Sequence, residues 1–111
     1  MIEKYDFGVI VINGKEYKKD VLLFEDKVFP NWWRKEGHHL YLADLEKILK
    51  LNPTILVIGT GYSGVMVVDN EVGQYCKEEG IKLIMEKTGE AVKAYNSMLG
   101  KSVAGALHLT C

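Results

Sequence analysis

The sequence predicts an α/β fold: one domain over residues 1–111, with a mixed sheet whose parallel centre is flanked by helices and an N-terminal antiparallel hairpin or meander. From Thr54 onward, strand and helix signals alternate, a pattern typical of right-handed crossover units on a parallel sheet. Before that point, short β-branched segments are separated by tight turn signals. A chain of 111 residues with 48% hydrophobic residues has room for one domain and its core.

The first quarter of the chain has the pattern of antiparallel strands. Tyr5 to Ile12 is rich in β-branched and aromatic residues. Asn13-Gly14 follows directly, and this pair favours a type I′ hairpin because both positions accept positive φ. The partner strand begins at Lys15-Glu16-Tyr17, and Val21 to Phe24 and Val28-Phe29 continue the meander.

A first helix is predicted over Asp44 to Leu51. Asp44 suits the first turn, and Asn52-Pro53 ends the helix because proline disfavours helical geometry in the residue before it. The apolar residues at helical spacing are Leu42, Leu45, Ile48 and Leu49.

Two further helices have recognisable ends. Asp69 is the predicted N-cap of a helix that runs to about Glu79, where Gly80 supplies a left-handed C-terminal residue. Thr88 is the predicted N-cap of the next helix, which ends at Gly100.

Three strands complete the predicted crossover units: Thr54 to Ile58, Ile81 to Met85, and Ser102 to Leu109. Ala104-Gly105-Ala106 in the last strand leaves little side-chain volume above the sheet. We therefore expect another element to pack closely against that strand.

The loop Gly59-Thr60-Gly61-Tyr62-Ser63-Gly64 imitates a dinucleotide fingerprint, because G-x-G-x-x-G follows a strand and Glu86 ends the next one. In a true fingerprint the helix starts inside the loop and directs its N-terminal amides at the pyrophosphate. Here Val65 to Val68 reads as extended chain, and helix signals begin only at Asp69. We therefore predict no NAD, no FAD and no other cofactor.

Two interpretations of this loop remain open. The structural one is that Gly59 and Gly61 let the chain leave the sheet sharply by adopting positive φ. The functional one is that the loop's exposed amides and Lys87 hold a small anion at the carboxyl ends of parallel strands. The candidate residues are Gly59, Thr60, Gly61, Tyr62, Ser63, Lys87 and Thr88. Ser63 lacks a nucleophile elbow, so we assign no catalytic residue.

The segment Trp32-Trp33-Arg34-Lys35 permits three interpretations. It could stack and neutralise single-stranded nucleic acid, but the net charge is −1, from 14 basic and 15 acidic residues, and no second basic aromatic segment exists. One tryptophan could instead fill the core beneath the loop. An exposed Trp33 with Arg34 would also make a good anchor for a protein partner, since both residue types dominate binding hot spots.

The histidines and cysteines predict neither a metal site nor a disulfide framework. His38 and His39 are adjacent and should point apart, and no C-x-x-C or H-x-x-x-H pair exists. Cys76 lies on the apolar face of a predicted helix and reads as a small core residue, whereas Cys111 reads as accessible.

The apolar runs and the charge balance give expectations about partners and compartment. The longest apolar runs are four or five residues, far shorter than the roughly 20 that span a bilayer. The opening Met1 to Asp6 lacks the apolar core of a signal peptide. We therefore expect a cytoplasmic protein that contacts neither membrane nor nucleic acid.

Segments spread over nearly the whole chain follow one family pattern: Phe7-Gly8 with the strand after it, Trp32-Trp33-Arg34, Val57-Ile58-Gly59-Thr60-Gly61, Thr88 with Ala91-Val92 and Tyr95-Asn96, and Val103-Ala104-Gly105-Ala106-Leu107-His108-Leu109-Thr110-Cys111. In order and spacing they resemble the Mth-domain family of small uncharacterised proteins, whose relatives include an adipogenesis-associated protein of animals and a mitochondrial complex I assembly factor. The resemblance implies a compact α/β domain with no settled activity, catalytic residue or cofactor.

The resemblance to an assembly factor favours a non-enzymatic binding or assembly module with a protein partner. The alternative is a small-molecule or anion-binding protein, or a small enzyme, that uses the cleft at the Gly59–Gly64 loop together with Lys87, Thr88 and Arg34. The sequence leaves the partner, the ligand and the oligomeric state open.

Overall fold

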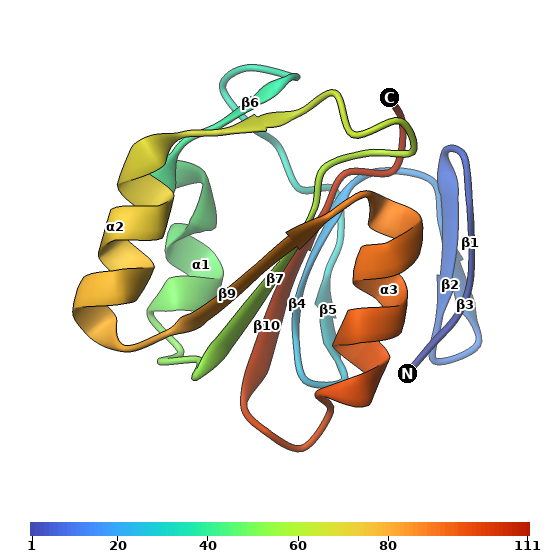
Figure 1. Ribbon diagram of the computed structural model, residues 1–111. Coiled ribbons are helices and arrows are strands. Elements are labelled where there is room, and N and C mark those ends of the chain that lie inside the picture. Colours follow the sequence, from blue (N-terminus) through green and yellow to red (C-terminus); the bar gives the residue numbers. More distant parts are fainter.

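A five-stranded mixed sheet forms the centre of the computed structural model, which describes residues 1–111 (Figure 1). The strand order is β5-β4-β10-β7-β9. Strands β10, β7 and β9 are parallel, and β4 and β5 join antiparallel at one side. The bounds are β4 (Val21–Phe24), β5 (Lys27–Phe29), β7 (Ile55–Gly59), β9 (Lys82–Glu86) and β10 (Val103–Leu107).

The parallel centre comes from two crossovers. Helix α2 (Asn70–Glu79) joins β7 to β9, and helix α3 (Thr88–Ser97) joins β9 to β10. The prediction of alternating strands and helices from Thr54 onward is confirmed. Asp69 caps α2 by accepting a hydrogen bond from the Glu71 amide, and Gly80 ends the helix with φ +70°, both as predicted.

The sheet separates two apolar cores, because alternate residues of each strand face opposite sides. Leu56 and Ile58 face α2 and the short helix α1 (Glu46–Leu49), whereas Val57 and Leu107 face α3. Figure 1 shows α1 and α2 on one side of the sheet and α3 with the N-terminal strands on the other.

The N-terminal strands form a separate antiparallel sheet of β1 (Ile2–Asp6), β2 (Val9–Ile12) and β3 (Lys15–Tyr17). The type I′ hairpin at Asn13-Gly14 is confirmed, with φ of +52° and +79°. The single predicted strand Tyr5 to Ile12 is wrong, because a turn with Gly8 at φ +77° divides it. The predicted meander is also shorter than expected, since β4 leaves it to pair with β10.

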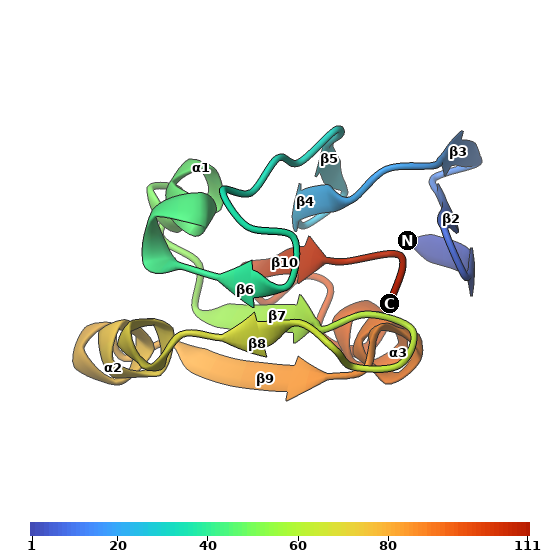
Figure 2. The same ribbon diagram turned by 90° about the horizontal axis from the view of Figure 1, so that it is seen from above.

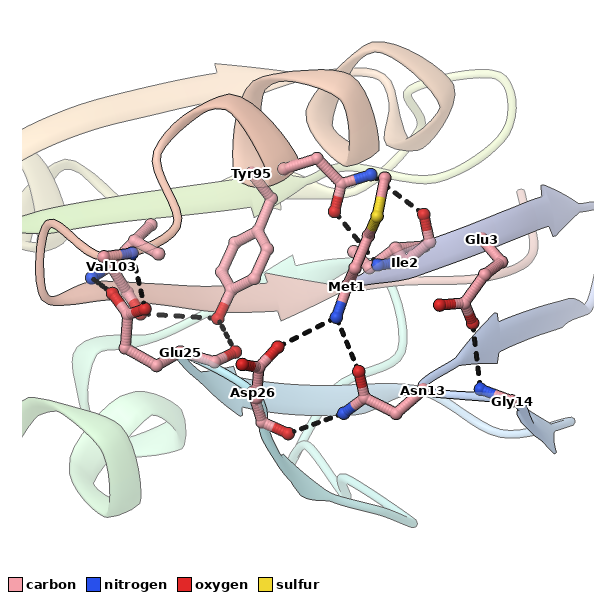
Figure 3. Close-up of polar contacts among 11 residues, drawn as sticks. Met1, Ile2, Glu3, Asn13, Gly14, Glu25, Asp26, Tyr95 and Val103 are labelled. Atoms are coloured by element: carbon pink, nitrogen blue, oxygen red, sulfur yellow. Dashed lines mark hydrogen bonds and ion pairs between the residues drawn. The ribbon is translucent and has the colours of Figure 1, made fainter.

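Polar contacts fasten this small sheet to the rest of the domain (Figure 3). The Asn13 side-chain amide donates to the Asp26 carbonyl at 2.8 Å, and the Tyr95 hydroxyl donates to the Glu25 carbonyl at 2.7 Å. The Glu25 carboxylate accepts from the Val103 amide at 2.9 Å. The turn between β4 and β5 thus bonds to the small sheet, α3 and β10.

The first predicted helix is present but differs in form and bounds. A 3₁₀ turn η1 (Leu42–Leu45) leads into α1 (Glu46–Leu49), in place of the predicted span Asp44 to Leu51. The helical segment starts earlier than predicted, at Leu42, because the Asp44 carboxylate accepts a hydrogen bond from the Tyr41 amide at 2.9 Å. Helix α1 ends at Leu49, and Asn52, whose φ is +56°, turns the chain just before the proline that predicted the stop.

Thr88 is the first residue of α3, and the prediction that it caps this helix is wrong. Lys87 occupies the N-cap position and its side chain makes no cap bond. The Thr88 hydroxyl is buried and donates to the His108 carbonyl at 2.6 Å, while accepting from the Gly61 amide at 2.9 Å. Thr88 therefore joins α3 to the chain after β7 and after β10.

Two short strands, β6 (His39–Leu40) and β8 (Val67–Val68), pair in parallel (Figure 2). Strand β8 follows the glycine loop in the chain. The extended chain predicted between the loop and the second helix is thus confirmed at Val67–Val68. No helix of the molecule is both long and apolar enough to cross a membrane.

Close packing at Gly105 is also confirmed. A Cβ atom placed there would lie 2.9 Å from Cε1 of Tyr95. The aromatic ring of Tyr95 is buried and rests directly on the backbone of β10. The small residues of this strand are therefore required by α3.

Candidate functional site

The glycine loop and Lys87 lie at one edge of the sheet, because β7 and β9 are parallel and end together. The Thr60 amide donates to the Glu86 carbonyl at 2.9 Å, and the Thr88 amide donates to the Gly61 carbonyl at 3.0 Å. A Cβ at Gly64 would lie 3.2 Å from Cγ of Lys87. The structure thus brings the predicted loop and Lys87 together.

The amides of this loop are already hydrogen-bonded within the protein, which corrects the basis of the predicted anion site. Those of Thr60 and Gly61 bond to Glu86 and Thr88 as described above. The Tyr62 amide donates to the Thr110 carbonyl at 2.9 Å, and the Ser63 and Val65 amides donate to the Cys111 carbonyl oxygen at 3.2 and 3.1 Å. Figure 2 shows the chain after β10 beside the loop that follows β7. That chain accepts the hydrogen bonds that the Tyr62, Ser63 and Val65 amides donate.

Gly59 and Gly61 are needed for different reasons. Gly61 has φ +112°, as predicted, and a Cβ there would lie 2.6 Å from the Thr110 carbonyl oxygen. Gly59 has no positive φ, so that part of the prediction is wrong. A Cβ at Gly59 would instead lie 2.8 Å from the Thr88 hydroxyl.

The outer side of the loop carries an aromatic pair. Tyr62 is 53% exposed and Phe7 54% exposed, and their rings meet edge to face with centroids 5.7 Å apart. Phe7 comes from the turn between β1 and β2, so residues far apart in sequence form this pair.

Arg34 is only 9% exposed, so the expectation that it lies on the surface beside Trp33 is wrong, whereas Trp33 itself is 78% exposed. Its guanidinium donates to the Asp20 carboxylate at 2.7 Å and to the Gly37 carbonyl at 2.8 Å. The same group lies over the Trp32 ring, 4.6 Å from its centroid. Arg34 therefore fixes the loop from inside.

Asp20, Arg34 and His108 form a buried polar cluster beside the carboxyl end of β10. Nδ1 of His108 lies 2.7 Å from the Asp20 carboxylate, which also accepts from the Leu109 amide at 2.8 Å. Burial opposes ionisation of Asp20, but hydrogen bonds from His108, Leu109 and Arg34 outweigh it and hold the pKa of Asp20 below its usual value. The carboxylate thus joins three separate segments.

The cluster also resembles part of a catalytic arrangement, because a carboxylate at Nδ1 orients an imidazole as a general base. Nε2 of His108 and Nε of Arg34 are buried and have no hydrogen-bond partner. No nucleophile is paired with Nε2, so the cluster as it stands ties segments together. Sequence reasoning missed the pairing of Asp20 with His108, because the two residues are 88 positions apart and belong to no local motif.

An aromatic cleft of about 840 Å³ opens between β5, the loop after it, and the η1–α1 segment. Trp32 forms part of its wall and is held by an indole Nε1 bond to the Asp44 carbonyl at 2.9 Å. Trp33 also lines the cleft and is 78% exposed. The apolar lining residues are Leu22, Phe29, Pro30, Trp32, Trp33, Tyr41 and Ala43.

Charges of both signs surround this aromatic cleft, which no candidate residue of the glycine loop lines. Lys35 and Lys47 supply the positive groups, and Asp44 and Glu46 the negative ones. The Lys47 ammonium lies 5.4 Å from the centroid of the Phe29 ring. A second hollow of about 570 Å³ shares Ala43 and Glu46 with the first and extends the surface along α1.

The fold defines a single α/β domain with a mixed sheet, an N-terminal antiparallel sheet and an aromatic cleft beside helix α1. Residues 2–108 match the model of the family described as protein of unknown function (DUF498/DUF598). The chain belongs to this family, in agreement with the Mth-domain resemblance.

Solved structures share the fold over the full chain. The conserved hypothetical protein PH1505 from Pyrococcus horikoshii is 26% identical, with a TM-score of 0.84 over 100% of this chain and 99% of that one. A protein from Bartonella henselae, described as an outer membrane protein, is 20% identical with a TM-score of 0.82 over 99% and 94%. A protein from Bordetella pertussis, described as a Mth938-like domain, is 15% identical with a TM-score of 0.59 over 98% and 85%.

Proposed function

We propose that this protein is a non-enzymatic binding or assembly module of the cytoplasm, and that the aromatic cleft holds an apolar segment of a partner protein. The observation that carries the proposal is Trp33, a tryptophan 78% exposed at the rim of a cleft with an aromatic wall. When a partner protein covers a side chain as large and apolar as that of Trp33 and excludes water from it, the contact contributes strongly to the binding free energy.

The cleft is held in shape before any partner arrives. The Trp32 amide donates to the Asp20 carbonyl at 2.8 Å, its indole bonds to Asp44, and its ring packs under Arg34. A binding surface that is already ordered loses less conformational entropy on association. The buried cluster therefore supports binding indirectly, by fixing the wall beside Trp33.

The charges at the rim restrict the partner segment. Two lysines and two acids surround an apolar floor, so neither a strongly acidic nor a strongly basic segment is favoured. The segment that fits has one or two aromatic or branched aliphatic anchors with charges of both signs beside them.

The alternative, a small anion or substrate at the glycine loop, has less support. The loop amides donate to protein oxygens, and Lys87 is the one predicted residue of this site with a cationic side chain. Without free amides, the loop lacks the convergent donors from which anion sites are built.

The experiment is a selection of random peptides displayed on phage against the purified protein. Peptides that bind should carry the apolar anchors described above. Trp33→Ala should weaken each selected peptide by at least about tenfold, the loss expected when a hot-spot tryptophan is truncated. Phe7→Ala is the matched control, because Phe7 is also an exposed aromatic residue but lies beside Tyr62.

The result that contradicts the proposal is equally specific. Peptides whose affinity is unchanged in Trp33→Ala but lost in Phe7→Ala would place binding at the glycine-loop edge. A selection that yields no binder above background would argue against a peptide-binding cleft altogether.

A further inference from the structure

We propose that strand β9 is a homodimer interface, at which two copies of this chain pair their β9 strands antiparallel across a two-fold axis. The two five-stranded sheets would then continue as one. The proposal rests on the position of β9, the direction of its backbone groups and the order of its side chains.

Strand β9 is the last strand of the sheet on its side and pairs only with β7. Figure 1 looks onto its free edge, with α2 on one side, α3 on the other and no element in front. An uncovered edge strand presents unpaired amides and carbonyls, which form a template for another strand.

The bonds at the two ends of β9 show which residues face outward. The Lys82 amide donates to the Thr54 carbonyl at 3.0 Å, and the Glu86 carbonyl accepts from the Thr60 amide at 2.9 Å. Because backbone groups alternate along a strand, Lys82, Ile84 and Glu86 bond to β7. The amides and carbonyls of Leu83 and Met85 therefore point away from the sheet.

A two-fold axis at Ile84 would give the free amides and carbonyls of Leu83 and Met85 hydrogen-bond partners in the second copy. In that register Leu83 of one protomer lies opposite Met85 of its partner, and the two residues exchange both backbone hydrogen bonds. The axis generates the same pair twice, which gives four intermolecular bonds. An isologous contact of this kind closes on itself and does not extend into a fibre.

The side chains select this register over its neighbours. With the axis at Ile84, Lys82 of each copy lies opposite Glu86 of the other, in the pairs where side chains approach most closely. Shifting the axis to Leu83 or Met85 leaves both charges without an opposite partner. The sequence Lys82-Leu83-Ile84-Met85-Glu86 is thus complementary to itself in one register.

The apolar residues of β9 agree with a contact. Ile84 would face its own copy across the axis, between the two Lys–Glu pairs. Met85 is 49% exposed and would pack beside Leu83 of the partner. Edge strands that are protected against pairing often carry lysine. Here each Lys82 would lie opposite Glu86 of the other copy, so these charges favour pairing of β9 with a second β9 strand.

Sedimentation velocity over about 5 to 500 μM tests the proposal. The wild-type protein should shift from monomer toward dimer as its concentration rises. Lys82→Glu and Glu86→Lys should each hold the protein monomeric, because each places like charges opposite one another. The double variant, with the two charges exchanged, should restore the dimer. Lys18→Glu, an exposed lysine of the β3–β4 loop, is the matched control and should leave dimerisation unchanged.

Amide hydrogen exchange gives a second readout that does not depend on charge. The Leu83 and Met85 amides should exchange rapidly in dilute protein and slowly in concentrated protein, while those of Ile84 and Glu86 stay protected at both. A protein that remains monomeric at 500 μM would overturn the proposal. A dimer that forms equally well with Lys82→Glu, or in which Leu83 and Met85 gain no protection, would also overturn it.

Discussion

Asp20 joins separate segments of the chain, since its carboxylate binds Arg34, His108 and the Leu109 amide. Asp20→Asn should lower the free energy of unfolding by about 3–5 kcal/mol at pH 7, because it leaves the Arg34 guanidinium buried without a counter-ion. Urea denaturation measures the loss, and Glu79→Gln, an exposed acid of α2, is the control. A variant as stable as the wild type would mean that the cluster contributes nothing.

The pH dependence of stability should follow from the same carboxylate. The pKa of Asp20 is depressed in the folded state, so its contribution is complete above its unfolded value of about 3.9 and is lost as pH falls toward the folded value. The difference in unfolding free energy between wild type and Asp20→Asn should therefore be largest at pH 5 to 7 and shrink below about pH 4. A difference that grows on acidification would contradict this assignment.

Gly61 and Lys87 are neighbours at the loop, but substitution should lower stability strongly at Gly61 and very little at Lys87. Gly61→Val should destabilise by several kcal/mol, because φ is +112° and a Cβ would collide with the Thr110 carbonyl. Lys87→Ala should change stability by no more than about 0.5 kcal/mol, as for a surface charge. Thermal melts of the two variants test the pair. Equal losses would show that Lys87 has a structural role.

At the scale of single elements, the sequence predicted close packing against the last strand, and helix α3 supplies it through Tyr95. Gly105→Ala should cost about 1–3 kcal/mol, because the added methyl would lie 2.9 Å from the buried Tyr95 ring. Gly73→Ala in helix α2 is a matched control, since a Cβ there meets no atom within 4 Å. A Gly105→Ala protein as stable as the wild type would show that α3 can shift at no cost.

Local sequence patterns were sufficient to predict those elements whose ends and apolar spacing are set by residues close together in the sequence. Asp69 and Gly80 marked α2, and Asn13-Gly14 marked the hairpin, because caps and turns depend on a few adjacent residues. The turn at Gly8 was missed because the β-branched pattern continues across it. The thiol positions were also predicted correctly, with Cys76 buried and Cys111 exposed.

The candidate site was harder to predict because its contacts join residues that are far apart in the sequence. The approach of Thr110 and Cys111 to the glycine loop cannot be read from either segment alone, yet it removes the loop's free amides. The burial of Arg34 likewise depends on Asp20 and His108. Trp33 was identified as a partner anchor by residue type, whereas the cleft beside it required the fold.

At the scale of the whole molecule, stability should not depend on the redox state. Both cysteines are free thiols, and burial raises the pKa of Cys76, so it is a poor nucleophile. The thermal midpoint should be the same with and without a reducing agent. A fall of several degrees on reduction would reveal a disulfide, which typically contributes about 2–4 kcal/mol.

The central claim is that a partner segment binds at the aromatic cleft and not at the glycine loop. The most direct test is a ¹H–¹⁵N correlation spectrum of the protein, recorded while a phage-selected peptide is added. The account predicts that the Trp33 indole signal and the amides of Phe29, Tyr41 and Ala43 move, while those of Gly59–Gly64 stay in place. Shifts confined to Gly59–Gly64, with the Trp33 indole unchanged, would contradict it.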